Sequence, residues 1–207
     1  HENVAVCLLD TGLNSAHPLL TSAADNDHIQ SVDASWRTND HHGHGTEMAG
    51  VSLYYDLKQA LLSKSPLKIA HEIESVKILP PTGENPPELY GAITVQAVAL
   101  AEIANPMANR VLCMAVTAPA YNTRDGSPTS WSAAIDNITS GAEENDEKRL
   151  FVISAGNVQP NEFGSSPYPE ANRLHSVESP GQSWNAITVG AYSDDSTISD
   201  PVFHGFT

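Results

Sequence analysis

The sequence predicts an α/β fold, a doubly wound and mostly parallel sheet with helices on both of its faces. Continuous apolar runs of strand length, such as Val4–Leu9 and Leu150–Ser154, are typical of strands buried on both faces. Longer apolar segments of helical character alternate with these strands, and this alternation favours a parallel sheet. The 207 residues, 40% of them hydrophobic, suit one core, so we expect residues 1–207 to be a single domain.

The first half of the chain contains strands and helices that end at prolines or in polar segments. Proline cannot donate to a sheet ladder and interrupts helices, so it marks the ends of elements. The expected elements are the strand Val4–Leu9, a polar surface excursion over Leu13–Asn39, one helix from Gly45 to Leu62, the strand region Leu67–Leu79, and the loop Pro80–Pro87.

The second half repeats the alternation and includes one long proline-containing loop. Its first helix is apolar on several sides and is expected to be well buried, whereas its second ends in an acidic run that is most simply solvated. The expected elements are the helix Glu88–Asn105, the strand Arg110–Val116, the loop Tyr121–Thr129, a helix starting at Ser130 or Ser132 that frays in Glu143–Glu147, the strand Leu150–Ser154, the loop Val158–Ser183, and the strand Ala186–Ala191.

Charge and cysteine content narrow the function class. A formal net charge of −15 argues against nucleic-acid binding, because a protein that neutralises phosphates needs a basic face. No apolar run reaches transmembrane length and no signal peptide is present, so no membrane partner is expected, and the chain is expected to be an excised domain. Cys7 and Cys113 lie in apolar runs, which favours free buried thiols and leans towards a reducing compartment without fixing the localisation.

The most informative stretch is His42-Gly43-His44-Gly45-Thr46. The glycines allow a sharp turn, Thr46 can cap a helix, and an imidazole at a helix start is held in the fixed direction that a general base needs. The same residues permit two other interpretations. His41, His42 and His44 beside Asp40 are a candidate metal site, and a solvated polar loop is the simplest alternative.

Two strand ends carry further polar groups. Asp10-Thr11-Gly12 follows the first strand, and Ala155-Gly156-Asn157 follows Leu150–Ser154. Open α/β sheets place their functional groups at the carboxyl ends of strands. An Asp-Thr-Gly strand end, a His-Gly-Thr helix start and a Ser-Ala-Gly-Asn strand end, in this order, resemble the subtilisin-like serine peptidases, the subtilase family. The resemblance extends from Val4 to about Tyr192.

The resemblance implies three catalytic residues. Asp10 would orient the base, His44 would be the base, and Asn157 would donate to the oxyanion through its side-chain amide. Each has a plainer interpretation, since Asp10 can cap the following turn and Asn157 can close a turn in the left-handed conformation. The three motifs together, each at an element boundary, favour the catalytic interpretation.

The family nucleophile has no counterpart in the sequence. Subtilases carry their serine in a Gly-Thr-Ser-x-Ala motif after the strand that resembles Asn185–Ala191, and no Gly-Thr-Ser occurs here. Gly164-Ser165-Ser166 and Gly181-Gln182-Ser183 precede that strand and lack the pattern. We therefore expect the N-terminal portion of a catalytic domain, inactive by itself, with the nucleophile beyond Thr207.

A second departure concerns substrate binding. The resemblance places Ala115, Val116 and Thr117 where the family has a Ser-Leu-Gly segment that lines the cleft and pairs with the substrate backbone. Thr117 in place of glycine adds bulk and predicts a narrower or differently formed primary pocket. A register shifted by one residue is the alternative.

Rival functions follow from single features. Asp-Thr-Gly is also the aspartic-peptidase signature, but that chemistry needs two facing carboxylates and the chain has one such motif. A subtilase-like pseudoenzyme that binds peptides or serves as a scaffold is the main alternative. We expect a peptide or protein substrate and no cofactor. No acidic loop has ligand-like spacing for the structural calcium that many subtilases bind, and the sequence leaves the oligomeric state open.

Overall fold

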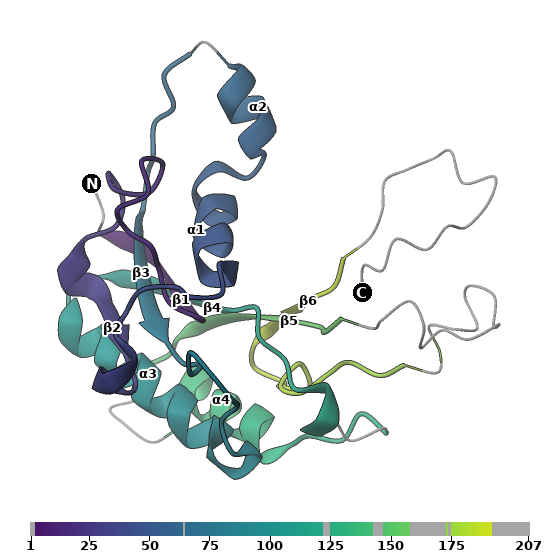
Figure 1. The fold of residues 1–207 in the computed structure, drawn as a ribbon. Helices are drawn as coiled ribbons and strands as arrows, with labels where there is room; N and C mark the ends of the chain where they lie inside the picture. The colour runs from purple at the N-terminus through teal and green to yellow at the C-terminus, as the bar shows by residue number, and fades with distance from the viewer. Residues whose placement is uncertain are drawn as a thin grey trace, which may run out of the picture.

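The computed structural model describes residues 3–63, 65–121, 125–142, 147–157, 173 and 175–191. Within these ranges the strands form one six-stranded sheet in which every neighbouring pair is parallel (Figure 1). The order across the sheet is β2-β3-β1-β4-β5-β6. The strands are β1 Val4–Asp10, β2 Ile29–Ser31, β3 Glu72–Lys77, β4 Asn109–Met114, β5 Leu150–Ser154 and β6 Ile187–Val189.

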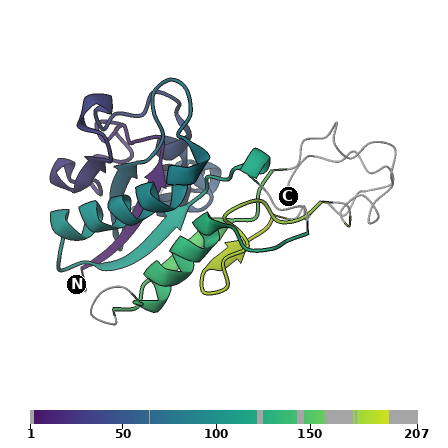
Figure 2. The same ribbon diagram turned by 90° about the horizontal axis from the view of Figure 1, so that it is seen from below.

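Helices lie on both faces of this sheet. Figure 1 shows α1 on one side with α2 extending from its far end, and α3 and α4 on the other side. From below, α3 and α4 lie side by side on the face nearest the viewer (Figure 2). The α-helices are α1 His44–Tyr54, α2 Leu57–Leu62, α3 Tyr90–Ala104 and α4 Ser130–Ser140, and the short 3-10 helices are η1 Asn26–His28, η2 Ala34–Trp36, η3 Pro87–Leu89 and η4 Pro119–Tyr121.

The central strand β1 is buried on both faces, as its continuous apolar sequence predicts. Cys7 and Leu9 pack in the larger core cluster, with α3 and α4, whereas Leu8 packs in the smaller cluster, with Ala49 of α1. Successive side chains of a strand point to opposite faces, so one apolar run serves both cores. The doubly wound parallel fold predicted from the sequence is therefore confirmed.

The strand order places the carboxyl end of β1 at the point where the chain changes direction across the sheet. From β1 the chain crosses to β2 and returns to β3, which pairs with one edge of β1, and β4 then pairs with the other edge. Ligands of open α/β sheets bind outside the carboxyl ends of strands at such a switch point. Asp10, the last residue of β1, lies there.

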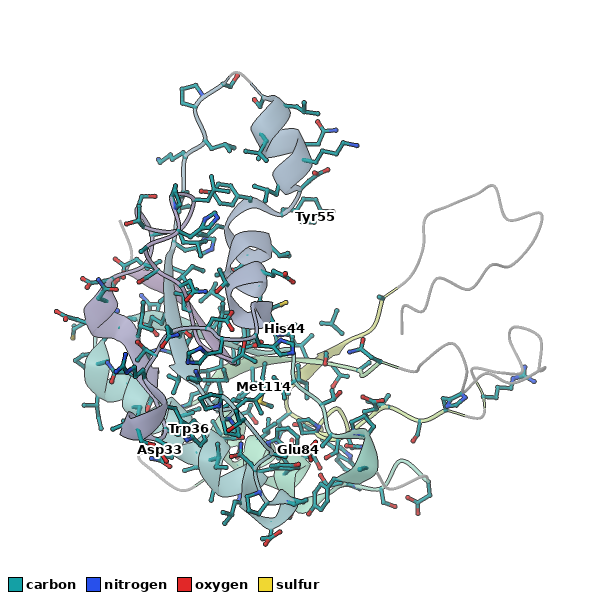
Figure 3. The ribbon with its side chains drawn as sticks, in the orientation of Figure 1. Asp33, Trp36, His44, Tyr55, Glu84 and Met114 are labelled. Carbon is teal, nitrogen blue, oxygen red and sulfur yellow. The ribbon has the colours of Figure 1, made fainter. Side chains whose placement is uncertain are left out.

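The helix expected from Gly45 to Leu62 is two helices. Figure 3 shows Tyr55 at the far end of α1, where it adopts φ 56° and interrupts the helical conformation. The side chain of Asp56 then accepts from the backbone N–H of Gln59 and caps α2. Asp-Leu-Lys-Gln has the capping-box pattern, which marks a helix start within the apolar run.

Other expected elements also differ in extent. The polar excursion contains β2, a three-residue strand with too few residues for a periodic pattern to emerge. The strand region Leu67–Leu79 is reduced to Glu72–Lys77. Helix α3 is less buried than predicted, because Val95 and Ile103 are exposed. Residues 143–146 of the acidic run Glu143–Glu147, in which the last long helix is predicted to fray, and most of the loop Val158–Ser183 lie outside the described residues.

Candidate active site

Asp10 meets His44 directly. The Nδ1 atom of His44 lies 2.8 Å and 2.9 Å from the two carboxylate oxygens of Asp10. Asp10 is 2% exposed and also accepts from the backbone N–H of Thr11 at 2.7 Å. The carboxylate of Asp10 therefore both caps the following turn and contacts the histidine.

His44 is the first residue of α1, and Figure 3 shows it at the end of the helix that faces the strands. Its side chain is 38% exposed and lines the main cavity. The hydrogen bond with Asp10 raises the pKa of His44 above its ordinary value, although partial burial opposes the rise. Because Nδ1 faces Asp10, the other ring nitrogen, Nε2, is the one available for proton exchange with a bound molecule.

Asp40 holds the start of α1. One of its oxygens accepts from the backbone N–H groups of His42 and Gly43, at 3.0 and 2.8 Å, and from the Thr11 hydroxyl at 2.9 Å. The other oxygen accepts from the backbone and hydroxyl of Thr46. Burial opposes ionisation, but these hydrogen bonds outweigh it and lower the pKa of Asp40. The expectation that Thr46 caps the helix is wrong, because its hydroxyl donates to Asp40.

Glycines allow α1 to begin against the end of β1. Gly43 adopts φ 97° and supplies the predicted turn. Gly45 has a different role, since a Cβ there would lie 2.2 Å from the carbonyl oxygen of Gly12. Its backbone N–H donates to the Thr11 hydroxyl at 3.0 Å. This close approach between helix and strand places His44 beside Asp10.

Asn157 follows β5 and lines the same cavity as His44. The residue is exposed, and its backbone N–H donates to Oε2 of Glu178 at 3.2 Å. The left-handed position of this turn belongs to Gly156, at φ 117°, so Asn157 does not close it in the way the plainer interpretation required. Its side-chain amide is free of that role.

Ala115, Val116 and Thr117 come directly after β4 and all three line the cavity. The Thr117 hydroxyl donates to Oε2 of Glu178 at 2.5 Å. Glu178 was missed at the sequence level, because it lies in the segment predicted only as a long loop. Its sole signal was a carboxylate among apolar and small residues, and no motif accompanies it.

One cavity of about 730 Å³ joins these groups. Its walls combine strand-end residues with an aromatic side formed by Tyr90, Tyr121 and Trp131, in which Tyr90 and Trp131 lie with ring centroids 4.8 Å apart. The cavity thus combines an aromatic wall with polar and charged groups near the strand ends, as ligand-binding sites commonly do. The predicted catalytic and substrate-binding residues that line it are His44, Ala115, Val116, Thr117 and Asn157, while Asp10 lies behind His44.

The remaining candidate residues include His41 and His42, which also line the cavity. Among the described residues no three His, Cys, Asp or Glu side chains are arranged to hold a metal ion, so His41, His42 and His44 do not form the alternative site with Asp40. Ser183 donates to Asp136 at 2.6 Å, which occupies its hydroxyl, and Ser165 lies outside the described residues. Cys7 is buried and Cys113 is half-buried, and both are free thiols as predicted.

No helix in the described part of the chain is long and apolar enough to cross a membrane.

Several solved structures of proteases are similar to this chain in fold. A psychrophilic protease, S41, matches with a TM-score of 0.54 and 18% identity over 91% of this chain and 53% of its own. The epidermin leader peptide processing serine protease of Staphylococcus aureus matches with a TM-score of 0.54 and 16% identity over 92% and 46%. The nisin leader peptidase of Lactococcus lactis matches with a TM-score of 0.52 and 15% identity over 92% and 56%.

The chain thus spans about half the length of these solved structures, and at such identities the likeness concerns the fold. Comparison with curated proteins found no significant match. The model of the subtilase family matches residues 1–202, nearly the whole sequence. With its parallel sheet and its motifs in the family order, the chain belongs to the subtilase family of serine peptidases.

Proposed function

We propose that this chain supplies the base, its orienting carboxylate and the oxyanion donor of a serine endopeptidase. The observation that carries the proposal is the contact of His44 Nδ1 with both oxygens of the buried Asp10, at 2.8 and 2.9 Å, at the wall of a cavity shared with Asn157. A histidine held by a buried carboxylate on one nitrogen and open on the other suits general acid–base catalysis.

In the first half-reaction a serine hydroxyl attacks the carbonyl carbon of the peptide bond and gives its proton to Nε2 of His44. Asp10 stabilises the resulting imidazolium and keeps the ring in place. The side-chain amide of Asn157 donates to the tetrahedral oxyanion. His44 then gives the proton to the leaving amine as the C–N bond breaks, which leaves an acyl-serine ester.

In the second half-reaction a water molecule takes the place of the amine. The water oxygen attacks the ester carbon and its proton goes to His44. When the tetrahedral species collapses, the bond between this carbon and the serine oxygen breaks, His44 returns the proton to that oxygen, and the acid is released. We assign Ala115, Val116 and Thr117 to substrate binding beside this centre, because they follow β4 and line the cavity.

We place the nucleophilic serine after Thr207, and we expect residues 1–207 alone to be inactive. The printed sequence contains no Gly-Thr-Ser, and the serine hydroxyls nearest to the family pattern are either bound to Asp136 or outside the described residues. The proposal therefore concerns the natural full-length protein.

Labelling with a fluorophosphonate probe tests the assignment. The natural full-length protein is expected to bind one equivalent of probe at a serine downstream of Thr207, identified by peptide mass spectrometry. His44→Ala should abolish the labelling, whereas His17→Ala, a change in an exposed histidine outside the cavity lining, should preserve it. A folded full-length protein that takes up no probe would refute the peptidase proposal and favour a peptide-binding pseudoenzyme.

A further inference from the structure

Glu178 is a buried carboxylate in the cavity that the proposed mechanism does not use. It is 6% exposed, and it lines the same cavity as His44 and Asn157. Its Oε2 atom accepts from the Thr117 hydroxyl at 2.5 Å and from the backbone N–H of Asn157 at 3.2 Å. Among the described residues no lysine, arginine or histidine forms an ion pair with it.

The backbone holds Glu178 firmly between two strand ends. Its N–H donates to the carbonyl of Ala155 at 2.8 Å, and its carbonyl accepts from Gly181 at 2.7 Å. The next residue, Ser179, accepts from the backbone N–H of Ala118 at 2.8 Å. Glu178 is thus fixed to the segments that follow both β4 and β5.

Gly156 makes room for the carboxyl group. A Cβ at this position would lie 2.5 Å from Cγ of Glu178 and 2.6 Å from both Cδ and Oε2. The carboxyl group therefore rests against the backbone of Gly156. Because Gly156 also adopts φ 117°, a side chain is excluded here by conformation as well as by space.

The electrostatics of the cavity favour a cation beside Glu178. An ionised carboxylate can accept about four hydrogen bonds, whereas the described residues supply two to this side chain. A buried charge is stabilised by an opposite charge that replaces its lost hydration. Lys77 also lines the cavity, but its ammonium donates to the carbonyl of Asn39 at 2.8 Å.

We propose that Glu178 determines substrate specificity by binding a lysine or arginine side chain of the substrate, at the residue on the N-terminal side of the cleaved bond. The inference rests on the proposed function, in which the carbonyl of that residue lies at the side-chain amide of Asn157. The backbone N–H of Asn157 bonds the Glu178 carboxylate, so a side chain that extends from this carbonyl into the cavity ends near Glu178.

Thr117 is a positioning residue in this arrangement. Its hydroxyl holds the Glu178 oxygen that also bonds Asn157, so the bulk that Thr117 adds in place of the family glycine gives the pocket an oriented acidic group. The net charge of −15 adds a long-range attraction for basic peptides.

The test compares two fluorogenic peptides that differ only in the residue before the cleaved bond, lysine in one and norleucine in the other. The natural full-length protein is expected to cleave the lysine peptide with a kcat/KM higher by on the order of 10²-fold, since an unpaired buried charge is strongly penalised. Glu178→Gln keeps an acceptor for Thr117 and should reduce this ratio to a few-fold. Glu88→Gln, at an exposed position outside the cavity lining, should preserve it.

A ratio near one for the natural protein, or a ratio unchanged by Glu178→Gln, would overturn the inference. If Glu178→Gln does not fold, the lysine-to-norleucine ratio of kcat/KM measured on the natural protein tests the inference by itself. Calorimetric binding of acetyl-Ala-Ala-Lys-amide and its norleucine counterpart separates this inference from the proposed function. Loss of all cleavage and of fluorophosphonate labelling refutes the peptidase, while tighter binding of the lysine peptide that Glu178→Gln abolishes still supports Glu178 as a cation site. Equal binding refutes the inference.

Discussion

Two buried carboxylates on neighbouring strands, Glu74 of β3 and Asp10 of β1, have opposite surroundings. Glu74 forms an ion pair with Arg110, whose Nε lies 2.5 Å from one carboxylate oxygen, and Asn105 donates to the other oxygen at 2.9 Å. Asp10 contacts His44, whose side chain is 38% exposed and lines the cavity. Glu74 faces a permanent charge in a closed group, and Asp10 faces a group that can lose its proton.

The difference separates a carboxylate in a structural ion pair from the carboxylate that we propose to be catalytic. Arg110 also donates to the carbonyls of Ala101 and Asn105 at the carboxyl end of α3, where a cation is favoured by the helix dipole. The described contacts of that guanidinium tie β4 to β3 and to the end of α3. His44 instead has one nitrogen on Asp10 and a ring edge towards the cavity, so burial alone does not indicate catalysis, but burial beside a titratable and accessible partner does.

The largest expected effect is on activity and follows from a substitution of Asp10. In the natural full-length protein, Asp10→Asn should lower kcat/KM for a peptide substrate by on the order of 10⁴-fold, a loss typical of the triad aspartate in serine peptidases. The amide keeps the size of the side chain but no longer stabilises the imidazolium. Asp27→Asn, at an exposed position, is the control. Activity within tenfold of the natural protein would show that Asp10 does not serve the base.

The second effect is on stability and follows from removing the partner of Glu74. Arg110→Met leaves a buried carboxylate without its cation and should cost about 3–5 kcal/mol of unfolding free energy, measured by urea denaturation. The second change Glu74→Leu should recover much of this loss, because no charge then remains unpaired. The fluorophosphonate labelling rate of the folded variant should stay unchanged. A cost under about 1 kcal/mol would mean that the pair is not a structural centre.

A smaller effect concerns the approach of α1 to β1. Gly45→Ala places a Cβ 2.2 Å from the Gly12 carbonyl and should cost about 1–3 kcal/mol by overpacking. Gly50→Ala is the matched control in the same helix, since its Cβ would meet nothing within 4 Å. It should raise stability by up to about 1 kcal/mol through helix propensity. Equal effects of the two changes in urea denaturation would contradict the close approach.

The same contrast explains what the sequence predicts and what it does not. The parallel sheet follows from apolar runs such as β1, and Asp10, His44 and Asn157 follow from motifs at element boundaries, because both signals are local. The contact of Asp40 with Thr11 and the contact of Glu178 with Thr117 join residues distant in the chain, and no local pattern encodes those contacts.

Sequence-based prediction is also limited where a regular apolar pattern contains an interruption. Periodicity extends across Tyr55 because the apolar residues on either side have helical spacing, although Asp56 caps a new helix. Glu74 likewise lies in a strand that contains several polar residues, and its partner Arg110 lies 36 residues further along the chain. A local pattern cannot indicate which distant cation will neutralise a buried carboxylate.

The smallest expected effect sharpens the comparison through proton binding at His44. Its pKa is raised because the hydrogen bond with Asp10 favours the imidazolium, so NMR titration of the ring should give a value above the ordinary 6.5, and Asp10→Asn should lower it.

A raised pKa of His44 stabilises the fold most at pH values below the ordinary pKa, and this contribution is lost as pH rises through the folded-state value. The stability difference between the natural protein and Asp10→Asn should therefore shrink from pH 5 to pH 9. The double variant Arg110→Met/Glu74→Leu removes both charges of the other site and leaves the histidines unchanged, so its stability difference from the natural protein should be nearly constant over the same interval. A deficit of Asp10→Asn that stays equally constant would mean that His44 does not exchange its proton under the influence of Asp10, and the distinction between the two carboxylates would then fail.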